Sequence, residues 1–273
     1  MNSSVVARFF RIFALRATAG FGLALILLPI VLVVWLAFFK QEIPSFPPDG
    51  YTLHWFGVAA GESKFIQGFS LSLRVALAAT ALGLLISVPA AVALNRFVFR
   101  GRLVVNNLLV LPMIVPGIVL GTALYIFEVN IELAADVPAI GSLWGLVMSH
   151  TLLVVPWCIR LLSASLTGLD RGIEDAAMNL GASPITTFFR ITLPNIRPGV
   201  VAASLFGFVV SFGNLEVTLF LVGPGQTTLP IAILQYLQWK IDPAIAAASV
   251  VQIVFICAAL VVTDRYVKLS RVV

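Results

Sequence analysis

Charged residues are scarce in this sequence: Asp, Glu, Lys and Arg make up 11% of its 273 residues, whereas hydrophobic residues make up 60%. A soluble domain of this size would have to expose much of that apolar side-chain surface to water, so the composition excludes one. The long apolar runs instead predict an all-α membrane protein that crosses the bilayer several times. The net charge of +5 is modest and requires no nucleic-acid partner.

Residues that carry chemistry are also few. The sequence has no GxxxxGK[ST] phosphate loop, so we do not expect this chain to hydrolyse ATP itself. Its two cysteines, Cys158 and Cys257, fall in apolar runs, which favours packing over a disulfide or a metal site. The histidines His54 and His150 have no evident nucleophile partner. We therefore predict no catalytic residue and no metal site.

Intervals with few or no charges predict about six membrane spans, since a helix needs about 20 apolar residues to cross the hydrocarbon. They lie at about 17–39, 68–94, 104–127, 141–163, 197–221 and 244–263. We interpret the first span as an uncleaved signal anchor. With both termini cytoplasmic, thirteen Lys and Arg residues lie inside and three outside, which agrees with the positive-inside rule. Residues 1–66 then form the anchor span and an outer loop, and 67–273 the main transmembrane domain.

Four prolines lie within the predicted spans and are expected to interrupt their helices: Pro89, Pro112, Pro116 and Pro156. Such breaks are tolerated where the freed carbonyl groups are buried in protein or line a cavity. Each proline is therefore compatible with a packing kink or with a break that lines a translocation path.

One carboxylate stands deep in an apolar stretch. Glu216 is costly there unless it faces a cavity or is paired. Ser211 and Asn214 precede it and give this span a polar side, so we take the three as candidate residues of a substrate path. The alternative is a carboxylate near the outer end of its span, either solvated or paired with Arg74.

The outer loop near 128–140 carries Glu128, Glu132 and Asp136, which we expect to form an acidic rim. Such a rim could attract cations weakly. Exposed carboxylates of this kind are mostly solvated, and that is the simpler interpretation.

The longest polar interruption of the chain runs from residue 168 to 198. Asp170 is placed to cap a helix over about 171–180 by accepting from free backbone N–H groups. Gly181 then occupies the position of a left-handed C-cap. These signals predict a short, well-defined helix rather than an irregular loop.

A second helix is expected to follow, with Ser183 as its cap and Pro184 at its first position. Leu193 and Pro194 are predicted to end this unit. A helix–turn–helix knob between two spans suits a rigid lever pressed into a partner protein. The alternative is a loop that packs only on itself.

The same segment closely resembles the EAA loop of permease subunits in bacterial ABC importers. That pattern is E-A-A, three residues, Gly, nine residues and I-x-L-P. Here it reads Asp175-Ala176-Ala177, then Gly181, then Ile191-Thr192-Leu193-Pro194, with every spacing matched and Asp in place of the usual Glu. The resemblance extends from roughly the second span to the C-terminus.

The resemblance implies an inner-membrane permease subunit whose coupling helix docks into a cytoplasmic ATPase dimer. ATP and Mg²⁺ would then bind the partner ATPase and not this chain. A second permease subunit, expected to be a different chain, a periplasmic solute-binding protein and membrane lipid complete the implied partners. The residues that would carry coupling to the ATPase are Glu174, Asp175, Ala176, Ala177, Gly181, Ala182, Leu193 and Pro194.

Within this family, the stretch around LFLVGPGQTTLP looks like the spermidine/putrescine subgroup and less closely like ferric-iron permeases. The polyamine pattern commonly has an acidic pair soon after Ser-Phe, where this chain has Gly213-Asn214. The resemblance implies a polyamine-like or other small amine-bearing solute. Ferric iron or another small organic solute is the alternative, and a channel or carrier that works without ATP is the alternative of a different class.

Overall fold

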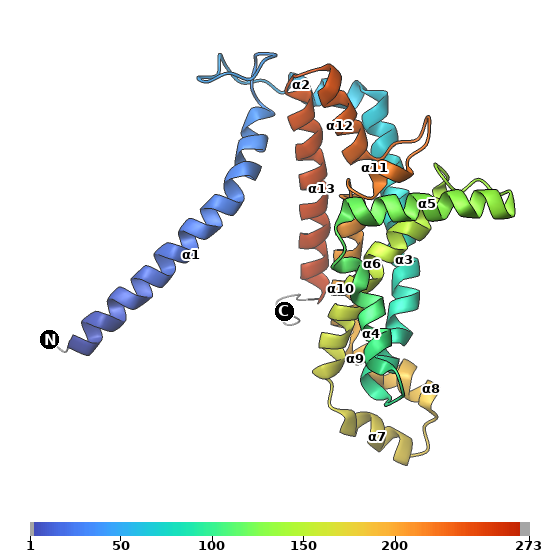
Figure 1. Ribbon diagram of the computed structural model, residues 1–273. Coiled ribbons are helices and arrows are strands. Elements are labelled where there is room, and N and C mark those ends of the chain that lie inside the picture. Colours follow the sequence, from blue (N-terminus) through green and yellow to red (C-terminus); the bar gives the residue numbers. More distant parts are fainter. Residues whose placement is uncertain (1–2, 268–273) are drawn as a thin grey trace. The chain divides into compact units, whose positions relative to one another are not determined.

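The computed structural model describes residues 3–267, and within this range the chain is helical, with only an isolated antiparallel bridge between Phe39 and Tyr51. The predicted all-α fold is confirmed (Figure 1). The chain divides into two compact units. One comprises the chain up to Glu62 together with Tyr236–Ile253, and the other comprises Ser63–Gln235 together with the chain from Val254 onward.

The first unit contains α1 (Ser3–Leu36) and α2 (His54–Gly61), joined by a segment that aromatic side chains hold in place. The buried indole of Trp55 donates to the carbonyl of Phe39 at 2.8 Å, and the indole of Trp35 donates to the hydroxyl of Tyr51 at 3.2 Å. Trp and Tyr rings with a polar tip suit a membrane–water interface.

Three helices form the core of the second unit: α3 (Ser63–Arg96), α6 (Leu143–Thr167) and α10 (Arg197–Phe212). Glycines let them approach closely, because a Cβ added to Gly83 of α3 or to Gly207 of α10 would lie 2.7 Å from a methyl group of Val154. Membrane helices commonly pack through such small residues. Val154 of α6 therefore fits between the other two helices.

The predicted span 104–127 is divided. The chain forms α4 (Arg102–Val110), a 3₁₀ turn η1 (Leu111–Met113) and α5 (Gly117–Ala135). The predicted interruption at Pro112 and Pro116 is confirmed, since these prolines lie in and just after the 3₁₀ turn. Figure 1 shows α5 running crosswise to α3 and α6.

Pro89 and Pro156, by contrast, do not interrupt their helices, so the prediction was wrong for these two. Both lie within continuous helices, α3 and α6 respectively. Beside them, the hydroxyl of Ser87 donates to the carbonyl of Val155 at 3.3 Å. Packing between two helices can offset the single backbone hydrogen bond that a proline removes.

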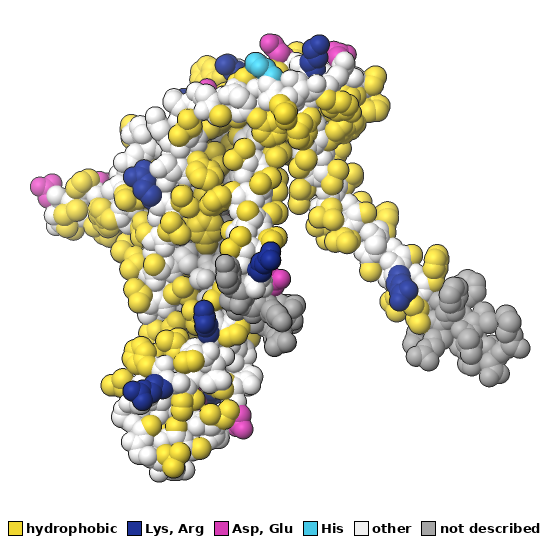
Figure 2. Space-filling view, turned by 180° about the vertical axis from the view of Figure 1, so that it is seen from behind, with side chains coloured by type: hydrophobic (Ala, Val, Ile, Leu, Met, Phe, Trp, Pro, Cys, Tyr) yellow, Lys and Arg dark blue, Asp and Glu magenta, His cyan; other side chains and the backbone are white. Residues whose placement is uncertain are grey.

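The predicted span 197–221 is also divided, into α10 and α11 (Thr218–Leu221), and α12 (Leu229–Trp239) and α13 (Ala244–Val267) follow. Five helices of the described residues are long and apolar enough to cross a membrane, and a sixth arises if the bent pair Pro184–Asn195 and Arg197–Phe212 counts as one span. In Figure 2, hydrophobic side chains cover the sides of the long helices. The fold is that of a multi-pass membrane protein.

Candidate functional site

The segment from residue 168 to 198, the coupling segment, begins with the predicted helix α7 (Arg171–Asn179). Asp170 caps this helix, because its Oδ1 accepts from the backbone N–H of Gly172 at 2.9 Å. Gly181 follows the helix with a φ of +92°, a left-handed conformation that side chains with a Cβ adopt at a cost. The predicted cap and the predicted glycine turn are confirmed.

The second half of the coupling segment begins with α8 (Pro184–Thr187), whose cap is the predicted Ser183: its Oγ accepts from the backbone N–H of Thr186 at 3.2 Å. A π-helical turn η2 (Phe188–Thr192) and α9 (Leu193–Asn195) follow.

Leu193 and Pro194 lie in the last short helix of the unit, which ends one residue later at Asn195, so the predicted end is confirmed to within one residue. Pro194 stands in the first turn of α9, where a helix does not need its backbone N–H. The direction changes one residue later, at Ile196, where the helices on either side are bent by 69°.

The coupling segment exposes large apolar side chains. Leu180 is 90% exposed, and three more large apolar side chains from both halves of the segment lie open: Ile173, Ile185 and Phe189. Exposed apolar surface between the membrane spans indicates a protein contact, because water does not favour it. A loop that packs only on itself would bury these side chains, and here they are exposed.

The predicted coupling residues differ in exposure. Five of them are open or partly open on α7 and the turn that follows it: Asp175, Ala176, Ala177, Gly181 and Ala182. Leu193 is half-buried and Pro194 is exposed, both on α9. Glu174 differs from all of these, because it is buried.

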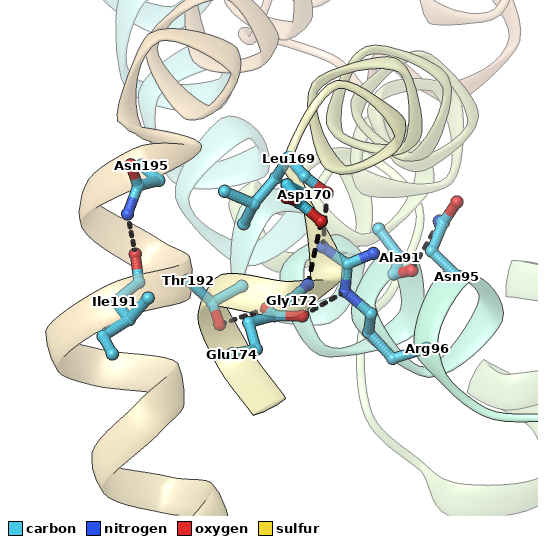
Figure 3. A network of polar contacts seen from close by, with 10 residues as sticks. All are labelled: Ala91, Asn95, Arg96, Leu169, Asp170, Gly172, Glu174, Ile191, Thr192 and Asn195. Carbon is cyan, nitrogen blue, oxygen red and sulfur yellow. Dashed lines mark hydrogen bonds and ion pairs between the residues drawn. The ribbon is translucent and has the colours of Figure 1, made fainter. Parts of the chain in front are cut away.

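Glu174 joins two other side chains in a buried cluster (Figure 3). Its Oε2 lies 2.7 Å from Nε of Arg96, the last residue of α3, and its Oε1 accepts from the hydroxyl of Thr192 at 2.5 Å. The contact with Arg96 is an ion pair and not a hydrogen bond, because the N–H of Arg96 Nε does not point at the carboxylate oxygen. We call Arg96, Glu174 and Thr192 the Arg96 cluster.

The sequence did not identify Arg96 or Thr192 as parts of this site. Arg96 lies 78 positions before Glu174, and no local motif links residues so far apart. The one available signal was the position of Glu174 in the first turn of an amphipathic helix, where the helix dipole stabilises a carboxylate. A carboxylate that faces inward from such a position needs a partner of opposite charge.

A second buried polar cluster lies between α6 and the break after α10. His150 is 1% exposed; its Nδ1 lies 2.8 Å from the hydroxyl of Ser211 and its Nε2 lies 3.1 Å from the hydroxyl of Thr218. Thr218 donates its hydroxyl proton to the carbonyl of Asn214 at 2.8 Å, so Nε2 of His150 is the donor to Thr218. We call His150, Ser211 and Thr218 the His150 cluster.

Of the predicted path residues, Ser211 therefore belongs to the His150 cluster and is 3% exposed. Asn214 precedes α11 by four residues, and its Oδ1 accepts from the backbone N–H groups of Val217 and Thr218 at 3.1 and 3.3 Å. Ser211 and Asn214 are linked through His150 and Thr218. Sequence reasoning missed His150, whose partners lie some sixty residues further along the chain.

Glu216 is exposed, and its carboxylate lies against the first residue of α5: a Cβ added to Gly117 would be 2.9 Å from Cδ of Glu216. The helix dipole favours a carboxylate at this end of α5. The predicted pairing with Arg74 is not formed among the described residues, because Arg74 instead donates from Nε to the carbonyl of Ser70 at 3.3 Å.

The predicted acidic rim is not a set of solvated carboxylates. Glu128 is 3% exposed and its carboxylate accepts from the hydroxyl of Ser149 at 2.7 Å. Glu132 accepts from the backbone N–H of Ala139 at 2.9 Å, and Asp136 ends α5 with a φ of +53°. The prediction was wrong for Glu128, because the crosswise direction of α5 turns this residue toward α6.

The bundle of apolar helices, with its broken spans, defines the class of this protein as a multi-pass membrane protein. Residues 79–270 match the family described as the binding-protein-dependent transport system inner membrane component. This match covers well over half of the chain, and the chain therefore belongs to that family. Its members are non-enzymatic subunits of ABC transporters, located in the inner membrane as multi-pass proteins.

Several curated proteins resemble the chain over most of its length. The putrescine transport system permease protein PotI of Escherichia coli is 29% identical over 84% of this chain and 81% of its own. The spermidine/putrescine transport system permease protein PotC of Haemophilus influenzae is 26% identical over 88% and 91%. The molybdenum transport system permease protein ModB of Mycobacterium bovis is 36% identical over 70% and 75%.

The fold is also that of a solved transporter. A bacterial alginate ABC transporter, solved in complex with an alginate pentasaccharide-bound periplasmic protein, has a TM-score of 0.73 to this chain. The match covers 96% of this chain and 95% of that one at 17% identity, so it shows the fold alone.

Proposed function

We propose that this chain is the permease subunit of an ATP-driven importer, forming a solute path across the inner membrane and coupled through residues 168–198 to a cytoplasmic ATPase. The observation that carries the proposal is the coupling segment itself. It is capped at both helix starts, turned by Gly181 and covered with exposed apolar side chains such as Leu180. A rigid apolar knob of this kind is what a protein socket would require.

The same proposal names the partners. An ATPase dimer would bind ATP and Mg²⁺, a second permease subunit of different sequence would complete the path, and a periplasmic solute-binding protein would deliver the solute. Support comes from the family, whose description includes dependence on a binding protein, and from the alginate transporter, which was solved with a periplasmic protein. On the ATPase face we place Asp175, Ala176, Ala177, Gly181 and Ala182, with Leu193 and Pro194 behind them.

For the solute we propose a polyamine-like or other small amine-bearing compound. PotI and PotC, named for putrescine and spermidine/putrescine transport, match the chain over more than four fifths of its length. We place Glu216 on the solute path as the group that favours a cation, with Asn214 and Ser211 shaping the helix break beside it. Ferric iron or another small solute remains the second candidate, and the match to ModB favours testing molybdate as well.

Purification from the native membrane in mild detergent tests the importer assignment. We expect the tagged chain to carry with it two ATPase copies and a second permease. A chain that purifies alone or as a self-oligomer, and moves solute in liposomes without ATP, would establish the channel or carrier alternative instead.

A solute panel tests the finer assignment. The reconstituted complex with its own binding protein would be given putrescine, spermidine, ferric iron, molybdate and a neutral sugar under ATP. We expect uptake of the two amines. Uptake of molybdate or ferric iron with none of the amines would overturn the amine assignment and leave the importer assignment intact.

A further inference from the structure

Glu174 and Asp175 are neighbours in α7, yet they differ in burial. Glu174 is 7% exposed, whereas Asp175 is open to solvent. Successive residues of a helix point about 100° apart, so one carboxylate can face the membrane domain while the next faces a partner. The buried Glu174 and the exposed Asp175 can therefore have different roles.

The inward carboxylate links three parts of the chain (Figure 3). Arg96 ends α3, Glu174 belongs to the first turn of α7, and Thr192 ends the π turn of the second half of the coupling segment. Arg96 also donates from Nη2 to the carbonyl of Leu169 at 3.4 Å, at the junction of α6 and α7. Both halves of the coupling segment are thereby fixed to the end of one long helix.

A neighbouring contact strengthens this attachment. Asn95, the residue before Arg96, donates to the hydroxyl of Ser163 in α6 at 3.0 Å. The end of α3 is therefore tied to α6 and to the coupling segment at once. Among the described residues, the contact between Arg96 and Glu174 is the single ion pair, and its two side chains are only 14% and 9% exposed.

From this geometry we infer that Arg96 and Glu174 are positioning residues: they transmit displacement of the coupling segment to α3, and they do not contact the ATPase. The inference rests on the proposed function, since it assumes that an ATPase moves the segment. A buried ion pair resists separation because each charge would be left without its partner. Exposed Asp175, and not Glu174, is then the carboxylate that faces the ATPase.

The experiment uses the full complex with its ATPase and binding protein in liposomes, and measures three quantities: ATPase copies retained on purification, ATP hydrolysis, and solute taken up per ATP. The main variant is Glu174→Gln, which keeps the volume and the acceptor for Thr192 but removes the charge. Glu42→Gln is the matched control, because Glu42 is exposed and forms no ion pair among the described residues.

We expect Glu174→Gln to retain the ATPase and its hydrolysis while uptake per ATP falls on the order of tenfold, the size of a typical coupling between two sites. The double variant Arg96→Glu with Glu174→Arg restores opposite charges and should recover much of the loss, whereas Arg96→Glu alone should not. Thr192→Val removes only one hydrogen bond and should lower uptake per ATP less. It also serves as the mild variant if the charge changes prevent folding.

Three results would overturn the inference: uptake per ATP unchanged in Glu174→Gln and in Thr192→Val, loss of the ATPase on purification of Glu174→Gln, or a double variant no better than Arg96→Glu alone. Failure of the proposed function would give a different result, because the chain without any substitution would then purify without an ATPase. That result would end both proposals, while the first three leave the importer assignment standing.

Discussion

The two polar clusters described above both satisfy polar side chains away from water, but they do so with different chemical groups. The Arg96 cluster holds full charges, 2.7 Å apart, at the end of α3 beside the coupling segment. The His150 cluster lies between α6 and the break after α10 and consists of an imidazole and two hydroxyl groups. The first cluster thus contains an ion pair, whereas the second contains only imidazole and hydroxyl groups.

The difference follows from the cost of taking a charge out of water. An ionised side chain in hydrocarbon is expensive, whereas a hydroxyl or imidazole with its partners satisfied costs little. A charged pair also depends strongly on its partner, because a lone buried charge remains when one side is removed. We therefore expect the Arg96 cluster to tolerate substitution less than the His150 cluster.

The largest effect should come from Glu174→Ala. This change leaves Arg96, a largely buried charge with a side chain 14% exposed, without its carboxylate, and we expect it to lower the free energy of unfolding by about 3–5 kcal/mol. Thermal unfolding of the purified chain in detergent measures the loss. The exposed neighbour gives the control, since Asp175→Ala should change stability little. Equal losses for the two variants would contradict the contrast in burial.

Gly181→Val should have the next effect, because a β-branched residue at a φ of +92° costs about 1–3 kcal/mol. The change redirects α8 from α7, so we expect uptake to be abolished while membrane insertion persists. Gly225→Val is a matched control, with a φ of +76° and, like Gly181, no atom within 4 Å of an added Cβ. Normal uptake by the Gly181 variant would contradict the coupling role of the segment.

Breaking the His150 cluster should cost less. His150→Phe removes two hydrogen bonds inside the helix bundle, and we expect a loss of about 1–2 kcal/mol, in the range measured between membrane helices. Ser211→Ala, alone and with His150→Phe, completes a double-mutant cycle by thermal unfolding. A loss as large as that of Glu174→Ala would remove the distinction between the two clusters.

Glu216→Gln should have the smallest effect. Glu216 is exposed at the start of α5, and exposed charges contribute about 0.2–1 kcal/mol, so uptake of cationic solutes should fall no more than about fivefold. Initial uptake rates across the amine and molybdate panel provide the measurement. An unchanged rate for every solute would mean that Glu216 only packs against the start of α5 and does not line the proposed solute path.

The coupling segment was predictable from sequence because its signals are local. Asp170 and Ser183 each bond a backbone group two or three residues away, and Gly181 fixes its own φ. The same holds for Pro112 and Pro116, whose break needs only their own rings. Nothing beyond these short stretches was required for the correct answer.

Contacts between distant residues were not predictable in this way. The partners of Glu174 and His150 depend on how α3, α6 and α10 pack, which no short pattern records. The regular course of the helices at Pro89 and Pro156 has the same origin, since neighbouring helices offset what each proline removes. Glu128 was misjudged because the direction of α5, unlike its apolar composition, is set by tertiary packing.

The bend at Ile196 has a mechanical consequence. Because Pro184–Asn195 and Arg197–Phe212 meet at 69°, a force along the first helix has only a minor component along the second, and most of it acts as a sideways torque. Ile196 is fully packed at 1% exposure and would act as the fulcrum. An inward push on the coupling segment would therefore tilt α10 more than slide it, and tilting widens one end of a helix bundle while narrowing the other.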